Sequence, residues 1–322
     1  MRLLSEAAYV LRTRLESSLQ SSHRDRPLLA IGLVLASTVF LSCSDVTAKY
    51  LASSVPAIEI AWLRYLVFLL IVLPPVLRTG VKRTFRSQRP GLQVFRGLAL
   101  VTSSILFISS LRYLPIAEAT ATSFAAPIFI TALSVVVLGE KVGYRRWAAT
   151  FAGLIGVLVV VRTGTSAFDP ASILPLMAAL SWASAVVVTR QTSAVDSALT
   201  TLAYSAVIGV LVLSALLPFF WMPPDWSTIL FGTLIGCAAT AGHSLIIVAF
   251  RYGDASVLAP FTYTQLVWVT GLGILLFGAI PDRWTVAGAT VIVSSGLYIA
   301  HRERIRSHEK GVGDAPKPSL VG

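Results

Sequence analysis

Charged side chains are sparse in the middle of this 322-residue chain: only 25 of the 41 lie between residues 28 and 301. A charge inside an apolar segment is costly unless it meets a substrate, an ion or a partner charge. Four such residues are therefore candidates for charge or ion coupling: Asp45, Lys49, Glu118 and Arg96.

Each of these four residues also has a structural interpretation, which the sequence leaves open. Asp45 and Lys49 are four positions apart, so on a helix they would share a face and form an ion pair. Glu118 follows a Leu-Pro step and would face the positive end of a helix dipole. Arg96 would extend its guanidinium to lipid headgroups.

Two further ionisable residues lie deep in apolar segments. Arg64 needs a partner or water, and we expect Glu59 on the same segment to form a structural pair with it. His243 is a packing residue or, because imidazole titrates near neutral pH, a proton relay.

Aromatic and amide side chains gather in the second half of the chain. Flat rings can enclose a planar substrate, and an amide can fix its orientation by hydrogen bonds. Gln265 and Trp268 are three positions apart and would share a helix face; ordinary core packing is the alternative. The predicted substrate-binding residues are Phe124, Trp182, His243, Tyr263, Gln265 and Trp268.

Other chemistry has no support in the sequence. A phosphate-binding loop, a Cys-x-x-Cys pair and a Gly-x-Ser-x-Gly nucleophile are all absent, and the four histidines are scattered. We therefore expect no metal, no cofactor and no ATP-driven step. Cys43 and Cys237 are interpreted as small packing residues.

The composition indicates an all-α membrane protein. Hydrophobic residues make up 55%, charged residues only 13%, and the mean hydropathy is +0.77. A soluble domain carries about 25% charged residues. A soluble enzyme, a disordered chain and a disulfide scaffold are thereby excluded. The net charge of +11 does not indicate nucleic-acid binding, because the Lys and Arg clusters adjoin apolar segments.

Ten segments are apolar and long enough to cross a membrane, which takes about 20 residues. Some carry small residues suited to close helix contacts, such as Gly156, and Gly232 with Gly236. The predicted spans are 28–48, 57–77, 91–111, 116–138, 145–162, 171–190, 198–220, 226–249, 255–279 and 284–301.

The basic residues predict the orientation of these spans. With the N-terminus inside, twenty of the 26 Lys and Arg residues fall on the cytoplasmic side and four outside. Such a bias is typical of cytoplasmic loops. We expect a multi-pass protein of the inner (plasma) membrane with both termini in the cytoplasm.

The chain shows an internal repeat at an offset of about 139 residues. Arg112-Tyr113 matches Arg251-Tyr252, and Gly139 matches Gly278. Two five-helix halves would insert in opposite orientations, which is typical of transporters with alternating access. Shared composition alone is the alternative. The predicted organisation is a tail (1–27), a first repeat (28–162), a second repeat (171–301) and a second tail (302–322).

Several motifs carry a family resemblance. They are Phe95-Arg96-Gly97, the stretch from Leu111 to Thr120, Ser123-Phe124-Ala125-Ala126-Pro127-Ile128-Phe129, and Leu138-Gly139-Glu140-Lys141. The chain resembles the EamA-type drug/metabolite transporter superfamily over residues 28–302. This resemblance implies two inverted five-helix repeats around a cavity lined by spans 1, 3, 4, 6, 8 and 9. Its Leu-Pro-Ile-Ala-Glu-Ala pattern is most similar to the S-adenosylmethionine and riboflavin importers.

The predicted function is secondary transport of a small metabolite. Riboflavin is the first candidate, because the expected lining is aromatic with few unpaired charges. Amino acids or S-adenosylmethionine are the alternative, with Asp45 or Glu118 holding a cationic group. An integral membrane enzyme and a scaffold protein are weaker alternatives. The expected partners are a small-molecule substrate and the lipid bilayer, not nucleic acid; a homodimer remains open.

Overall fold

The computed structural model describes residues 27–139, 143–162, 168–193, 195–249, 252 and 255–313. Within these residues the secondary structure is entirely helical. The predicted N-terminal tail up to residue 26, the sequence end from residue 314, and the repeat position Arg251 lie outside the described part.

The helices follow the predicted apolar segments. In chain order they are α2 (Pro27–Ala52), α3 (Ala57–Thr79), α4 (Val81–Thr84), α5 (Pro90–Tyr113), α6 (Ile116–Ser123), α7 (Ala126–Leu138), α8 (Tyr144–Val161), η1 (Pro170–Ser172), α9 (Ile173–Thr192), α10 (Ala198–Leu216), η2 (Leu217–Phe219), α11 (Trp226–Ala249), α12 (Ala255–Thr262), α13 (Thr264–Phe277) and α14 (Arg283–Gly313). The last helix thus continues 12 residues beyond the predicted span end at 301.

Within the described residues, eight helical segments are long and apolar enough to cross a membrane. They comprise α2, α3, α5, α6 with α7, α9, α10, α11, and Pro260–Phe277. The apolar stretch of α8, Trp147–Val161, is shorter, and α14 is not among the eight. The structure therefore supports a multi-pass membrane protein, and eight of the ten predicted crossings meet the length and apolarity of a span.

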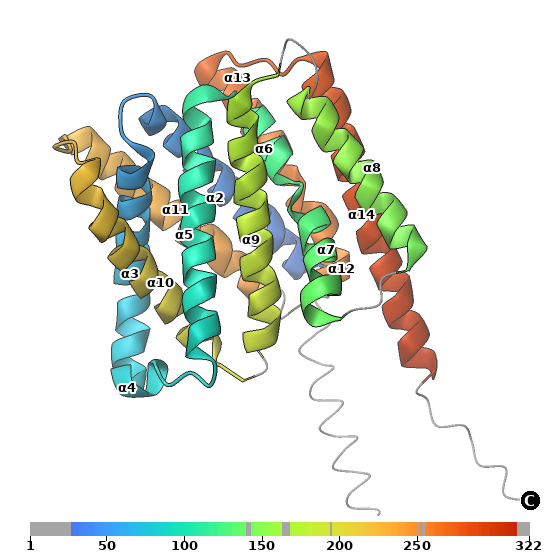
Figure 1. The fold of residues 1–322 in the computed structure, drawn as a ribbon, viewed down its shortest axis with the longest axis horizontal. Coiled ribbons are helices and arrows are strands. Elements are labelled where there is room, and N and C mark those ends of the chain that lie inside the picture. The colour runs from blue at the N-terminus through green and yellow to red at the C-terminus, as the bar shows by residue number, and fades with distance from the viewer. Residues whose placement is uncertain are drawn as a thin grey trace, which may run out of the picture.

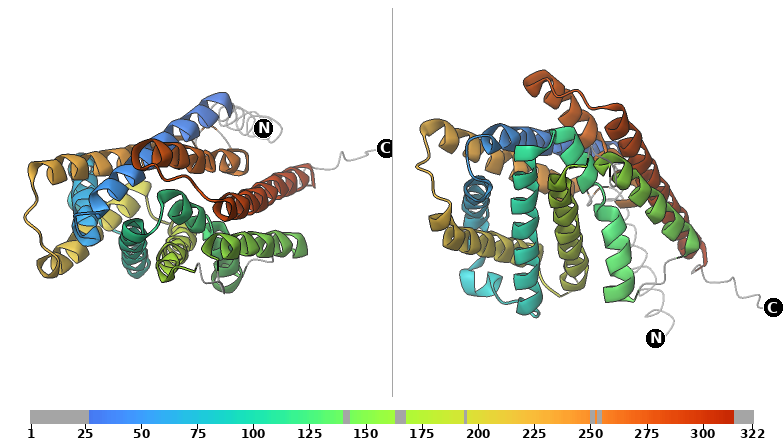
Figure 2. Two further views of the ribbon diagram at one scale, coloured as in Figure 1. Left: turned by 90° about the horizontal axis from the view of Figure 1, so that it is seen from above. Right: turned by 45° about the horizontal axis from the view of Figure 1, so that its top comes forward.

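The helices pack in two layers. In Figure 1, α5 and α9 stand side by side in front, with α2 and α11 behind them. The view from above in Figure 2 separates the layer of α2, α11 and α13 from that of α5, α9 and α8. At one end α3 packs against α10, and at the other α8 packs against α14.

Two predicted spans are broken helices. Span 116–138 changes direction at Phe124 and Ala125, between α6 and α7, and span 255–279 breaks at Tyr263, between α12 and α13. Pro127 is in the first turn of α7, just after the first break, and Pro260 is inside α12, three residues before the second. Proline lacks an N–H and its ring clashes with the preceding turn, so a helix bends or ends there.

The breaks occupy equivalent positions in the two halves. Phe124 and Tyr263 are 139 positions apart, and so are Gly139 and Gly278, which end α7 and α13. Both glycines have a left-handed backbone, with φ of 67° and 63°, which glycine adopts without steric cost. The two halves therefore share helix order, breaks and terminating turns.

Glycines bring two pairs of helices into close contact. Gly232 and Gly236 of α11 lie against Leu63 and Val67 of α3. Gly156 of α8 faces Gly288 of α14, and each glycine lies close to the backbone carbonyl of the other. The predicted small-residue contacts of spans 5 and 8 are confirmed.

Candidate functional site

Asp45 of α2 lies opposite Gln265 of α13. The Gln265 Nε2 donates to Asp45 Oδ2 at 3.0 Å, and the hydroxyl of Ser42 donates to the Gln265 carbonyl at 3.3 Å. Two turns from Asp45 along α2, the hydroxyls of Thr38 and Thr264 are 3.0 Å apart. Polar bonds therefore join the two halves of the chain along α2 and α13, where the sequence alone predicted no pairing.

Arg64 of α3 lies within electrostatic range of Asp45 and of His243. Within the described residues the Arg64 guanidinium forms neither a hydrogen bond nor an ion pair. The predicted pairing with Glu59 is wrong: Glu59 Oε2 accepts a hydrogen bond from the backbone N–H of Met222 at 3.2 Å. Residues five apart point about 140° away from each other on a helix, which explains the difference.

Trp182 and His243 form a stacked pair between α9 and α11. Their ring centroids are 5.9 Å apart, and the ring planes are inclined by 22°. Trp182 lies near the middle of α9, yet 38% of its surface is accessible. Part of the Trp182 ring is thus not covered by protein atoms.

Phe124 and Tyr263 meet at the two helix breaks. Their ring centroids are 5.1 Å apart, with the planes inclined by 43°. Gly296 of α14 lies directly against the Tyr263 hydroxyl, where any larger side chain would collide with it. The two broken spans therefore touch through aromatic rings at equivalent positions of the repeat.

Trp268 takes no part in these contacts. It is 44% accessible and makes no ring contact or hydrogen bond within the described residues. The structure brings Gln265 to Asp45 and leaves Trp268 apart, although both are on α13.

Arg96 donates hydrogen bonds to polar neighbours from the second half. Its Nε donates to Thr189 Oγ1 at 2.6 Å, and its Nη1 donates to the hydroxyl of Ser205 and to the Thr201 carbonyl. The expected extension to lipid headgroups is therefore not observed, because α9 and α10 supply acceptors much closer by. Arg96 ties α5 to both helices.

Lys49 does not form the predicted ion pair with Asp45. Its ammonium group donates to the carbonyls of Leu111 and Leu114, at 2.5 and 2.9 Å. These carbonyls end α5, where the helix dipole is negative and acceptors lack partners. The cation is attracted to this helix end more strongly than to the carboxylate one turn away.

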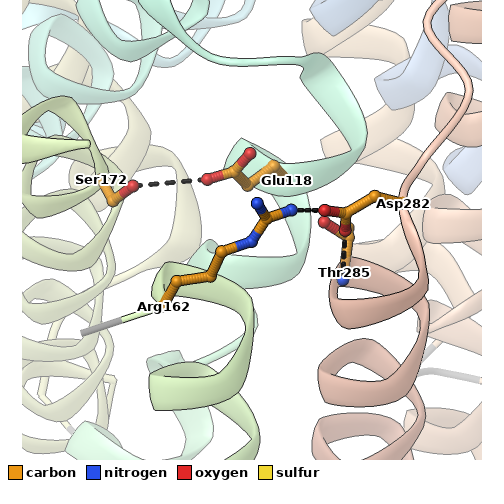
Figure 3. Close-up of polar contacts among 5 residues, drawn as sticks. All are labelled: Glu118, Arg162, Ser172, Asp282 and Thr285. Carbon is orange, nitrogen blue, oxygen red and sulfur yellow. Dashed lines mark hydrogen bonds and ion pairs between the residues drawn. The ribbon is translucent and has the colours of Figure 1, made fainter. Parts of the chain in front are cut away.

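Glu118 belongs to a separate polar cluster at one end of the bundle (Figure 3). The Ser172 hydroxyl donates to Glu118 Oε1 at 3.4 Å, and the Arg162 guanidinium lies between Glu118 and Asp282. Arg162 forms an ion pair with Asp282, which also accepts the Thr285 N–H at 2.8 Å and so caps α14. The cluster joins the ends of α6, α8, α9 and α14 rather than the central residues.

Asp196, in the loop before α10, anchors the opposite end. It accepts hydrogen bonds from Ser87, Gln88 and Gln93 at 2.5, 2.9 and 2.8 Å. Partial burial raises the pKa of Asp196, but bonds from Gln93, Ser87 and Gln88 and the charge of Arg89 outweigh it and hold the pKa below its ordinary value.

The central residues thus comprise Asp45, Arg64, Trp182, His243 and Gln265, and we call them the central cluster. It has one carboxylate, one guanidinium, an amide and two stacked rings from five helices. No group of three metal-ligating side chains occurs in the part of the chain that the structure describes. The sequence predicts a structural pair for Arg64, although the depth of this residue in an apolar helix was a signal for a central role.

Comparison with known proteins gives the family. The EamA-like transporter family matches the chain twice, at residues 28–162 and 170–300. An S-adenosylmethionine uptake transporter of Rickettsia felis is 30% identical over 88% of this chain and 97% of its own length. A riboflavin transporter of Vibrio cholerae is 29% identical over 87% and 95%, respectively.

Two more distant matches come from sequence and from structure. The pseudopaline exporter CntI of Pseudomonas aeruginosa is 25% identical over 84% of this chain and 95% of its own. A protein of known crystal structure has the same fold, with a TM-score of 0.59 and 20% identity, and covers 86% of this chain. The predicted resemblance is confirmed: the chain is a membrane transporter that belongs to the EamA-like transporter family.

Proposed function

We propose that this transporter is a secondary carrier in which two inverted five-helix halves alternate around the central cluster. The ten crossings would be α2, α3, α5, α6 with α7, α8, α9, α10, α11, α12 with α13, and α14. The count of basic residues supports cytoplasmic termini in an inner membrane. The matched breaks support alternating access, because broken helices at equivalent positions of a repeat are typical of transport sites.

The substrate is a metabolite with a planar ring system. The observation that carries this proposal is the stacked pair of Trp182 and His243, in which the Trp182 ring, near the middle of α9, is only partly covered. Aromatic faces bind flat rings by offset stacking, and a nearby carboxylate or amide then fixes the orientation. Asp45 and Gln265 supply both groups.

S-adenosylmethionine is the first candidate. It combines a flat adenine ring with a sulfonium and an ammonium charge, and the Asp45 carboxylate is the complementary anion. The Rickettsia felis relative is named for uptake of this compound.

Riboflavin is the second candidate, favoured by the ring pair and by the riboflavin transporter of Vibrio cholerae. The Gln265 amide, which was expected to orient a flavin, already donates to Asp45. A flavin would have to replace that bond, whereas a cationic substrate would keep Asp45 ionised and Gln265 in place.

Uptake of radiolabelled S-adenosylmethionine and riboflavin into liposomes containing the purified protein tests this proposal. We expect saturable uptake of the first compound. The Trp182→Ala variant should raise its KM about 2- to 10-fold, as expected for the loss of one stacking contact. Trp226→Ala is the matched control, because Trp226 is 78% exposed at the start of α11.

The outcomes separate the candidates. Saturable riboflavin uptake without S-adenosylmethionine uptake would establish the second candidate. If protein-free liposomes took up each compound as well as liposomes containing the protein, transport of both compounds would be refuted. Equal KM values for the Trp182→Ala and Trp226→Ala variants would remove the ring pair from the site. Conversion of either compound in the recovered solution would indicate a membrane enzyme instead.

A further inference from the structure

Arg64 has hydrogen-bond donors without acceptors among the described residues. It lies at the end of the second turn of α3 and is half-buried. Its guanidinium offers five donors in a planar fork, yet it forms no hydrogen bond or ion pair within the described residues. A guanidinium in a membrane-spanning segment requires an anionic or polar partner.

Arg64 differs in this respect from the other arginine of the apolar spans. Arg96 donates to Thr189, Ser205 and the Thr201 carbonyl. Arg96 therefore already has protein acceptors, while the fork of Arg64 is available to a ligand.

The surroundings of Arg64 indicate the chemistry of that ligand. Asp45 lies within electrostatic range of Arg64, but the two do not reach ion-pair distance, and Gln265 holds the carboxylate of Asp45. The region thus presents a positive and a negative group, separated from each other and both incompletely paired. His243 is also within electrostatic range of Arg64, and its ring stacks on that of Trp182.

An α-amino acid group matches this pair of charges. Its carboxylate and its ammonium are attached to the same carbon atom and carry opposite charges. Arginine binds carboxylates through two parallel N–H···O bonds, which gives both strength and orientation. Ammonium groups bind carboxylates such as that of Asp45 by charge-assisted hydrogen bonds.

We propose that Arg64 and Asp45 bind the carboxylate and the ammonium of a zwitterionic α-amino acid group, with Trp182 and His243 alongside the attached ring. This proposal rests on the transport function proposed above and narrows the substrate to ring-bearing α-amino acids. Arg64 is then a specificity-determining residue, because it rejects a substrate that lacks the carboxylate.

The test compares uptake of S-adenosylmethionine with uptake of its decarboxylated form into liposomes. The two compounds share the adenine, the sulfonium and the amino group and differ only in the carboxylate. The wild-type protein should favour S-adenosylmethionine in kcat/KM by about 10- to 100-fold, the range expected for a charge-assisted hydrogen bond. Arg64→Gln should reduce this ratio to near one, and Arg64→Lys should retain part of it.

Arg78→Gln is the control variant, because Arg78 is exposed in the last turn of the same helix. It should keep the wild-type ratio. The ratio is measured within one preparation, so it does not depend on the amount of folded protein. Monodisperse elution from a sizing column confirms that each variant is folded.

The wild-type measurement decides between the two proposals even if Arg64→Gln fails to fold. Uptake of both compounds with equal kcat/KM would overturn the role of Arg64 and leave transport intact. An unchanged preference in a folded Arg64→Gln protein would do the same. Saturable uptake of riboflavin alone would overturn the amino-acid group and the first candidate substrate together.

Discussion

At the scale of single residues, charges in the apolar helices bind helix ends and neutral side chains more often than each other. Lys49 binds the carbonyls of Leu111 and Leu114, and Arg96 binds hydroxyls. Such partners satisfy donors without burying a second charge, whose desolvation would be costly.

The position of Lys49 predicts a loss of stability that is independent of Asp45. Lys49→Met should destabilise the protein by about 1–2 kcal/mol, because two carbonyls at the end of α5 lose their donor. Thermal unfolding in detergent measures this change. Asp45→Asn serves as the comparison. If the double variant loses as much stability as the two single variants together, Lys49 and Asp45 act independently. A smaller loss of stability in the double variant would indicate an ion pair between them.

Asp196 predicts a pH dependence of stability. Its pKa is lowered from 3.8 by bonds that include that from Gln93, so the folded state binds the proton less tightly than the unfolded state. The stabilisation of the folded state by the Asp196 carboxylate is therefore complete above about pH 4, the pKa of an unfolded Asp. This stabilisation is lost as the pH falls through the pKa of Asp196 in the folded state.

Thermal unfolding between pH 3 and pH 6 checks this prediction. The wild type should lose stability below about pH 4 more steeply than Asp196→Asn, which has no carboxylate there to protonate. Parallel curves for the two proteins would contradict the role of Asp196.

The residues of the central cluster were only partly predictable from the sequence. Asp45, Trp182, His243 and Gln265 were recognisable, because polar or bulky groups in the middle of apolar helices are unusual. The pairing of Asp45 with Gln265 was not, because 220 positions separate the two residues and the contact depends on the packing of α2 against α13. The distant carbonyls that bind Lys49 were likewise invisible.

At the scale of helices, glycines determine which pairs come closest. A Cβ added to Gly288 would lie 2.5 Å from the Gly156 carbonyl oxygen, and one added to Gly156 would lie 2.9 Å from the Gly288 carbonyl oxygen. Backbone atoms cannot rotate away as a side chain can, so α8 and α14 would have to separate.

Gly288→Ala should therefore destabilise the protein by about 1–3 kcal/mol through overpacking. Gly32→Ala is the control, because an added Cβ at Gly32 of α2 meets nothing within 4 Å. The control should be neutral or stabilising by about 0.5–1 kcal/mol, since alanine favours helices over glycine. Unfolding temperatures in detergent compare the two, and equal changes would argue against the close contact.

Helix positions followed from apolar runs and proline signals, whereas the breaks did not. Both broken spans are apolar enough on average to cross a membrane, so hydrophobicity predicts single helices there. Pro127 and Pro260 were visible in the sequence, but a proline is compatible with either a kink or a complete break. The neighbouring helices decide between these outcomes.

The two ends of the bundle are fastened in an equivalent manner. Glu59, at the start of α3, accepts the backbone N–H of Met222 from the segment before α11. Asp196, just before α10, accepts the backbone N–H of Gln88 from the segment before α5. By chain order α3 corresponds to α10 and α5 to α11. In each half, an acid at the start of the second helix therefore binds the segment that precedes the third helix of the other half.

At the scale of the whole molecule, the proposed orientation makes a direct prediction. Reporters that are active only in the cytoplasm should be active when fused to either terminus or inserted in the loop at residues 85–89. The same reporters should be inactive at residues 221–225. Opposite activities at the two termini would show an odd number of crossings and refute the inverted halves.

The architecture was the most predictable level. Composition identified a helical membrane protein, and the apolar segments, the repeat offset and the family motifs agreed with one another. These features depend on average properties of many residues, which tolerate single exceptions. Contacts at the site depend on a few atoms and therefore required the folded structure.

The shared position of the two helix breaks bears on the ancestry of the chain. A break inherited by both copies would have been present in a single five-helix polypeptide before its gene was duplicated and fused. That polypeptide would have assembled with a second molecule of itself in the opposite orientation, with residues equivalent to Phe124 and Tyr263 facing each other. Fusion would then have released the two copies to diverge, and the contact of Phe124 with Tyr263 would record that divergence, because only one of these two equivalent rings carries a hydroxyl.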